Sequence, residues 1–126
     1  MTMTEQKLRA VFRLDAASGA LMGAPLVVFA GPLAPLLGLP EPLLFWGGLA
    51  LFPVAATMLA AAATLARPLV LLVVWGNVAW AVACAALMAA LPVTGLGVLF
   101  LLVQIAFVLA MAYLESRPAT GGEMAA

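Results

Sequence analysis

The sequence has no histidine, one cysteine and few charged residues, which make up only 8% of its 126 residues. Without histidine, a haem with an axial imidazole and a zinc site are both disfavoured. The single cysteine, Cys84, excludes an intramolecular disulfide, and we interpret it as a small buried apolar side chain. A net charge of zero argues against a nucleic-acid partner, which requires a basic patch. We therefore expect no metal, no other cofactor and no nucleic acid.

Apolar residues take the place of the missing charges. Hydrophobic residues make up 67% of the chain, and the mean hydropathy is +1.26. A soluble domain is about 45–50% apolar and about a quarter charged. Too few charged side chains are present to coat a water-soluble surface, so the solvent of most of the chain must be lipid. The length predicts one domain over residues 1–126, without a separate soluble module.

Four apolar stretches are long enough to cross about 30 Å of hydrocarbon at a helical rise of about 1.5 Å per residue. They cover residues 12–30, 43–66, 69–91 and 94–115. Residues 31–42 are rich in proline, and we expect an outer loop in the membrane interface or a short re-entrant segment there. Residues 116–126 are expected to form a flexible cytoplasmic tail. The short connections predict an all-α, membrane-spanning antiparallel four-helix bundle.

All basic residues fall on one side of these spans. They are Lys7, Arg9, Arg13, Arg67 and Arg117. Because basic residues are retained on the cytoplasmic face, we expect both termini in the cytoplasm. The segment 2–14, "TMTEQKLRAVFRL", is predicted to be an amphipathic helix. It either lies on the inner leaflet or extends the first span by two turns.

Asp15 is an acidic residue in the first apolar span. A carboxylate at the bilayer centre costs about 2.5–3.5 kcal/mol on insertion scales. We place Asp15 within a turn of the membrane interface. Three alternatives exist for its carboxylate there: it contacts Arg67 or backbone groups, it is simply solvated, or it functions by titrating or by binding a cation. Gly19 and Gly23 continue the helix face of Asp15, and their spacing predicts close packing against another helix.

Spans three and four each contain one amide, Asn77 and Gln104. An unsatisfied amide in hydrocarbon is costly, so both are expected to face the bundle interior and to bond between helices. Alternatively, Asn77 acts with Asp15 in ligand binding or a proton relay. Asn77 lies about eight residues, or roughly 12 Å by helical rise, into its span, whereas Asp15 is early in its own, so direct contact requires a deeper Asp15. The candidate polar pocket consists of Asp15, Asn77, Trp80, Gln104 and Arg67.

Three short segments carry a resemblance: "FRLDAASGALMG" in span one, "GPLAPLLGLP" after it and "NVAW" in span three. With them the chain resembles a group of small bacterial four-span integral membrane proteins, in which an R-L-D start, a P-L…L-G-L-P loop and N-x-x-W recur. The matched positions are Arg13, Asp15, Asn77 and Trp80. The resemblance implies a compact bundle in the bacterial inner membrane and no particular activity. The chain is less similar to the small multidrug resistance family, whose midspan glutamate and aromatic cage have no match here.

The sequence contains no recognisable catalytic set. It has no histidine base, and we expect no carboxylate pair and no phosphate-binding loop, so we predict no catalytic residues and no enzymatic activity. Two hypotheses follow. The protein is a structural or accessory bundle that packs with its own copies or with a larger membrane complex, or it is a small transporter or binder of a hydrophobic or cationic compound that uses Asp15, Asn77 and Trp80.

Overall fold

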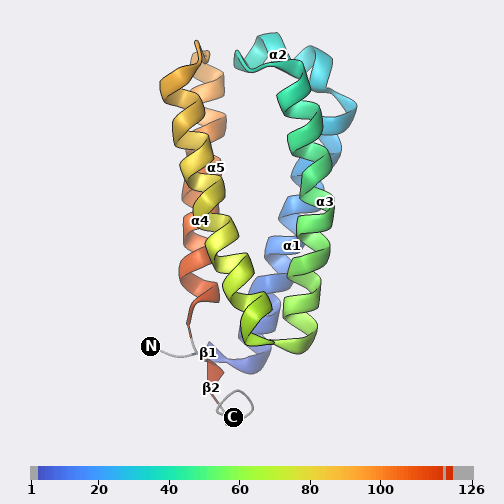
Figure 1. Ribbon diagram of the computed structural model, residues 1–126, viewed down its shortest axis with the longest axis vertical. Helices are drawn as coiled ribbons and strands as arrows, with labels where there is room; N and C mark the ends of the chain where they lie inside the picture. The colour runs from blue at the N-terminus through green and yellow to red at the C-terminus, as the bar shows by residue number, and fades with distance from the viewer. Residues whose placement is uncertain (1–2, 118, 121–126) are drawn as a thin grey trace.

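The structure is a computed structural model that describes residues 3–117 and 119–120, and these form the predicted all-α bundle. Its long helices are α1 (Glu5–Val28), α3 (Glu41–Thr64), α4 (Arg67–Ala90) and α5 (Gly95–Glu115), and α2 (Ala30–Leu37) is short. The chain runs up α1, down α3, up α4 and down α5 (Figure 1). Two-residue strands β1 (Met3–Thr4) and β2 (Ala119–Thr120) pair in parallel. Of the expected tail, residues 118 and 121–126 lie outside the described residues.

The distribution of side chains is that of a protein surrounded by lipid. Large apolar side chains cover the outside: Leu21 is 76% exposed and Trp75 is 65% exposed. In contrast, Asp15 and Asn77 are only 2% and 4% exposed. All four long helices are long and apolar enough to cross a membrane. The chain is therefore a small multi-pass membrane protein.

The first helix begins at Glu5, seven residues before the predicted start of the first span. Thr4 is its N-cap, and the Thr4 hydroxyl accepts a hydrogen bond of 3.2 Å from the Lys7 amide. Leu8 and Phe12 are 1% and 0% exposed because they pack into a core cluster with the C-terminal part of α3. Of the two alternatives for the amphipathic segment, the structure has the one in which it extends the first span.

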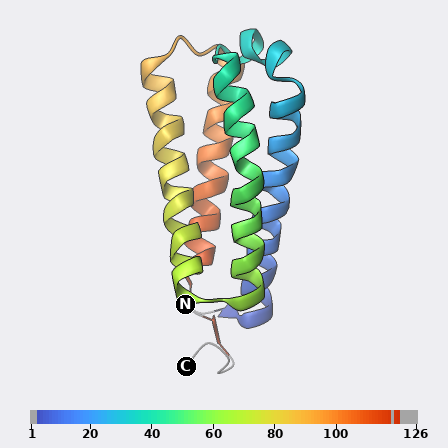
Figure 2. The ribbon, with the colours of Figure 1, turned by 45° about the vertical axis from the view of Figure 1, so that its right-hand side comes forward.

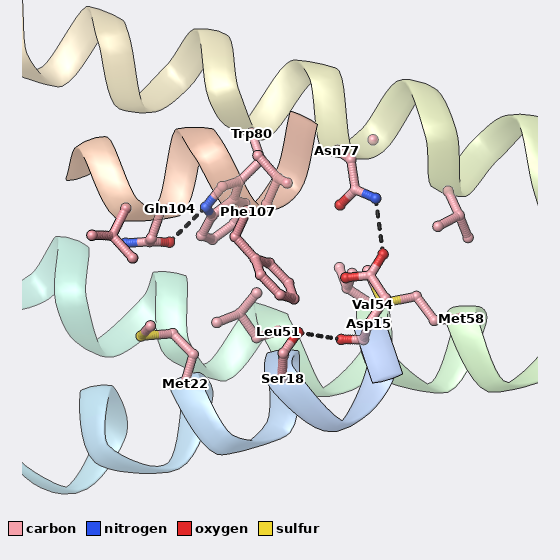
Figure 3. A pocket seen from close by; sticks show the side chains of 15 residues that line it. Asp15, Ser18, Met22, Leu51, Val54, Met58, Asn77, Trp80, Gln104 and Phe107 are labelled. Carbon is pink, nitrogen blue, oxygen red and sulfur yellow. Dashed lines mark hydrogen bonds between the residues drawn. The ribbon is translucent and has the colours of Figure 1, made fainter. Parts of the chain in front are cut away.

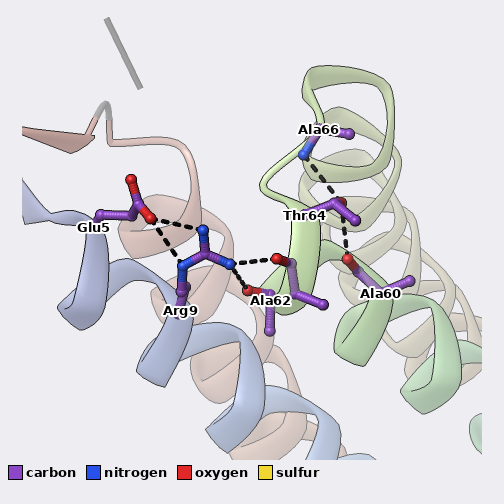
Figure 4. Close-up of polar contacts among 7 residues, drawn as sticks. Glu5, Arg9, Ala60, Ala62, Thr64 and Ala66 are labelled. Atoms are coloured by element: carbon purple, nitrogen blue, oxygen red, sulfur yellow. Dashed lines mark hydrogen bonds and ion pairs between the residues drawn. The ribbon is translucent and has the colours of Figure 1, made fainter. Parts of the chain in front are cut away.

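The Arg9 side chain caps the C-terminal end of α3 (Figure 4). Its guanidinium donates to the carbonyl oxygens of Ala62 and Ala63 and forms an ion pair with Glu5, 2.6 Å from Oε1. The last carbonyls of a helix have no partner within the helix, so a neighbouring side chain must satisfy them in lipid. The chain then reverses at Leu65, which has a left-handed φ of 49°.

The proline-rich segment 31–42, predicted as an interfacial outer loop or a short re-entrant segment, contains most of helix α2. Pro32 lies in the first turn of α2, where backbone N–H groups have no helical partner, so the proline is tolerated there. Pro35 lies inside the helix. The helix ends at Gly38, whose φ of 72° is the left-handed conformation that glycine favours at such ends.

Helix α2 is attached to the start of α5. The Thr94 hydroxyl donates to the Leu36 carbonyl at 2.8 Å, and the Thr94 amide donates to the Leu37 carbonyl at 3.1 Å. A Cβ at Gly38 would lie 2.8 Å from the Pro92 carbonyl oxygen, so glycine is also required by the close approach of the two segments.

The long helices pack as two pairs, α1 with α3 and α4 with α5, and fewer contacts join the pairs. The axes of all four long helices run in roughly the same direction, side by side (Figure 2). Within the first pair, a Cβ at Gly23 would lie 2.7 Å from the Gly48 carbonyl oxygen. A Cβ at Gly19 would be 3.8 Å from the Leu51 carbonyl oxygen, an ordinary contact. Of the two predicted packing glycines, Gly23 is thus at the closest approach of α1 and α3.

Candidate binding cavity

A cavity of about 290 Å³ lies between the two helix pairs and is lined by all four long helices (Figure 3). Most of its wall is apolar, with Met22, Leu51 and Phe107 among the lining residues. Polar groups are few, and they are contributed by Asp15, Ser18, Asn77, Trp80 and Gln104. Four of the five residues of the predicted polar pocket therefore line one space.

Asp15 of α1 and Asn77 of α4 join the two helix pairs directly. Asn77 Nδ2 donates to Asp15 Oδ2 at 2.9 Å (Figure 3). Asp15 lies ten residues after the start of α1 at Glu5. Asn77 likewise lies ten residues after the start of α4. Both are about 15 Å along helices that run in the same direction, which brings the two side chains to one level.

Glu115 is a site residue that the sequence analysis missed. Its carboxyl is 1% exposed, and its Oε1 accepts a hydrogen bond of 2.8 Å from the same Asn77 nitrogen. The expectation of no carboxylate pair is wrong, because Asp15 and Glu115 share one donor. Glu115 is the last residue of the predicted fourth span, and the sequence analysis assigned it no role. A usable signal was its position eleven residues after Gln104, about three helical turns along the same face.

Trp80 and Gln104 form the other polar contact of the cavity. Trp80 Nε1 donates to Gln104 Oε1 at 2.8 Å and links α4 to α5 (Figure 3). Both residues also line a second, apolar cavity of about 160 Å³. The Trp80–Gln104 pair therefore lies in the walls of both cavities. Cys84 lines this second cavity and, as predicted, is a buried free thiol.

Arg67 does not belong to the polar pocket. Its side chain is exposed at the first residue of α4, and within the part of the chain that the structure describes it forms no salt bridge. The prediction that Asp15 contacts Arg67 is wrong, because the side-chain partner of Asp15 is Asn77. Ser18 adds a local contact, because its hydroxyl donates to the Asp15 carbonyl at 2.7 Å.

The arrangement offers an apolar space with a carboxyl group at one wall. Such a space can accept an apolar molecule, and the carboxyl can receive a cation or a hydrogen-bond donor. Within residues 3–117 and 119–120, no three potential metal-ligating side chains are grouped together. Comparison with known protein families, with curated proteins and with solved structures found no match for the chain.

Proposed function

We propose that this membrane protein binds an apolar small molecule with a cationic or strongly hydrogen-bond-donating group in the 290 Å³ cavity, and transports it or holds it there. The observation that carries this proposal is the cavity itself, with Asp15 in a wall that is otherwise almost entirely apolar. Small-molecule sites in proteins combine an apolar lining with a few polar groups in the same way.

The preference for a cation rests on the charges around the cavity. Among the described residues that line it, Asp15 is the acidic one and none is basic. Trp80 and Phe107 also line the space, and aromatic rings attract cations through their negative faces. An ammonium group in the cavity therefore shares a space of low dielectric constant with a carboxyl group and two aromatic side chains.

A structural or accessory bundle is the second candidate function. It is favoured by the use of Asn77 and of the Trp80–Gln104 pair as bonds between helices, which is the usual role of polar side chains in membranes. In that case the partner is a second copy of the chain or a larger membrane complex. Acyl chains of lipids would then occupy the cavity.

We further propose that the protein acts by binding, not by catalysis, and that it resides in the bacterial inner membrane with both termini in the cytoplasm. The resemblance to small bacterial four-span proteins supports the location. The basic residues at one end of the bundle support the orientation.

Ligand binding is testable with a pair of probes of equal shape, benzyltrimethylammonium and its neutral isostere neopentylbenzene. In the purified Trp46→Phe/Trp75→Phe variant, Trp80 is the remaining tryptophan, because the sequence has three. Trp46 and Trp75 are 64% and 65% exposed, so their replacement leaves the cavity intact. We expect a saturable change in Trp80 fluorescence with the ammonium probe, and at least about tenfold weaker binding of the neutral probe.

Two glycines provide a matched control for this measurement. A Cβ at Gly76 or Gly95 meets no atom within 4 Å, but only Gly76 lines the cavity. Gly76→Leu should weaken binding of the ammonium probe at least about tenfold, whereas Gly95→Leu should not change it. Asp15→Asn should remove the preference for the charged probe. A non-saturable response, or equal binding to both glycine variants, would favour the structural bundle.

A further inference from the structure

Two buried carboxyl groups meet at one amide, and ligand binding at Asp15 accounts for only one of them. Asp15 and Asn77 line the cavity, whereas Glu115 is not part of its wall. The oxygens of the two carboxyl groups lie 2.9 Å and 2.8 Å from the same Asn77 nitrogen. Asp15 and Glu115 are 2% and 1% exposed, so the two carboxyl groups are buried away from bulk solvent.

Within the described residues, no basic side chain neutralises this pair. The basic side chains on the neighbouring elements are exposed or engaged elsewhere: Lys7 and Arg13 of α1 and Arg67 of α4 are exposed, Arg9 binds Glu5 and the end of α3, and Arg117 stacks 4.9 Å from the Tyr113 ring. The charged residue of α3 is Glu41, in its first turn at the opposite end of the bundle. Asn77 therefore offers the pair an uncharged donor and no compensating charge.

One oxygen of the pair has no hydrogen-bond partner among the described residues. Glu115 Oε2 is buried and accepts no hydrogen bond from the described residues. A charged oxygen in that position loses its hydration and gains no hydrogen bond in exchange, which disfavours the ionised form. Two neighbouring ionised carboxylates add their mutual repulsion, and a single bound proton removes both penalties.

We propose that Asp15 and Glu115 hold one proton between them, and that a cation entering the cavity displaces it. In the empty state one carboxyl is protonated and the other is ionised, so the pair has a charge of about −1. When an ammonium ion binds beside Asp15, the proton passes to water and both carboxyls are ionised. The pair and the cation together again carry about −1, so the exchange leaves the buried charge unchanged. The exchange rests on the proposed function, whereas the shared proton does not.

The shared proton is tested without any ligand by infrared spectroscopy of the carboxyl C=O stretch in the purified protein. We expect a protonated carboxyl band at pH 7 that persists well above the pH at which an exposed carboxyl titrates. Asp15→Asn and Glu115→Gln should each move the loss of this band to lower pH, because the like charge is gone. Glu41→Gln, at an exposed carboxyl, should leave the band unchanged.

The exchange is tested with the unaltered protein in weakly buffered solution containing a pH indicator. Binding of benzyltrimethylammonium at pH 7 should release about one proton per bound ion, and its affinity should rise up to about tenfold per pH unit while the pair is protonated. Neopentylbenzene should release none. This measurement needs no variant, so it stands if Asp15→Asn fails to fold.

The outcomes separate the two proposals. Absence of the band at pH 7, its persistence unchanged in both carboxyl variants, or its removal by sodium chloride would overturn the shared proton, the last in favour of a bound sodium ion. Ammonium binding without proton release would overturn the exchange and leave the proposed function intact. If the infrared band behaves as expected but the protein binds no ammonium probe, the shared proton stands and the proposed function is contradicted.

Discussion

At the scale of single residues, Asn77 is the centre of the polar structure. Its amide nitrogen donates to Asp15 and to Glu115, and so ties three helices, α1, α4 and α5, together at one point. The Trp80–Gln104 bond, by comparison, joins only α4 and α5. Hydrogen bonds between membrane helices contribute about 0.6 kcal/mol on average, with larger values where a buried polar group has no other partner. The two amides should therefore differ in their contribution to stability.

We expect Asn77→Leu to destabilise the protein by about 2–3 kcal/mol, because it leaves two buried carboxyl groups without a donor. Gln104→Leu removes one acceptor from one indole N–H and should cost only about 1 kcal/mol. Unfolding of both variants in mixed micelles of increasing denaturing detergent would measure the difference. Equal losses of stability would show that Asn77 has no special place among the polar side chains.

At the scale of secondary-structure elements, the end of α3 depends on a residue of α1. Arg9 satisfies the carbonyl groups of Ala62 and Ala63, immediately before the chain reverses at Leu65. A guanidinium presents several donors in a fixed plane, so one side chain serves both carbonyls and Glu5 at once. The contact fixes α1 against α3 and hence the level at which Asp15 faces the cavity.

Arg9→Ala should lower the free energy of unfolding by about 1–2 kcal/mol, because the last carbonyls of α3 lose their donor. Arg13→Ala removes the same charge from the same helix, but Arg13 is exposed, so it serves as the matched control. Thermal unfolding in detergent would compare the two. If both variants lose the same stability, the effect arises from the charge and not from the cap.

At the scale of the whole molecule, two helix pairs are joined at both ends and separated in between. The Thr94 contacts with α2 connect them at one end, and the short turn from α3 to α4 connects them at the other. Between these ends the cavity separates the two pairs, so each pair keeps its own closer packing on either side of it.

The proposed orientation is tested by chemical labelling of intact bacterial cells. In a Cys84→Ala background, single cysteines at two exposed positions, Gln6→Cys and Glu41→Cys, mark opposite ends of the bundle. A membrane-impermeant maleimide should label position 41 in intact cells and label position 6 only after the cells are opened, because the basic end faces the cytoplasm. The reverse pattern would contradict the orientation.

Part of this structure follows from hydropathy and helix punctuation. Length and apolar composition predict four membrane-spanning helices, and four helices long and apolar enough to span a membrane are present. The first of them, α1, begins seven residues before the predicted start of the first span. That difference matters because it places Asp15 ten residues after the start of the helix. The conformation of the proline-rich segment did not follow from its sequence: Pro32 falls in the first turn of α2, where it breaks no hydrogen bond, so a helix forms there.

Composition and length are enough to predict a membrane-embedded bundle of four helices, since both properties depend on local stretches of the chain. The identity of the polar groups that meet is visible only once the helices are packed together. Asn77 reaches Asp15 across 62 positions and Glu115 across 38 positions of the chain. Such meetings depend on the rotation and relative height of neighbouring helices, which the pattern of any single helix does not contain.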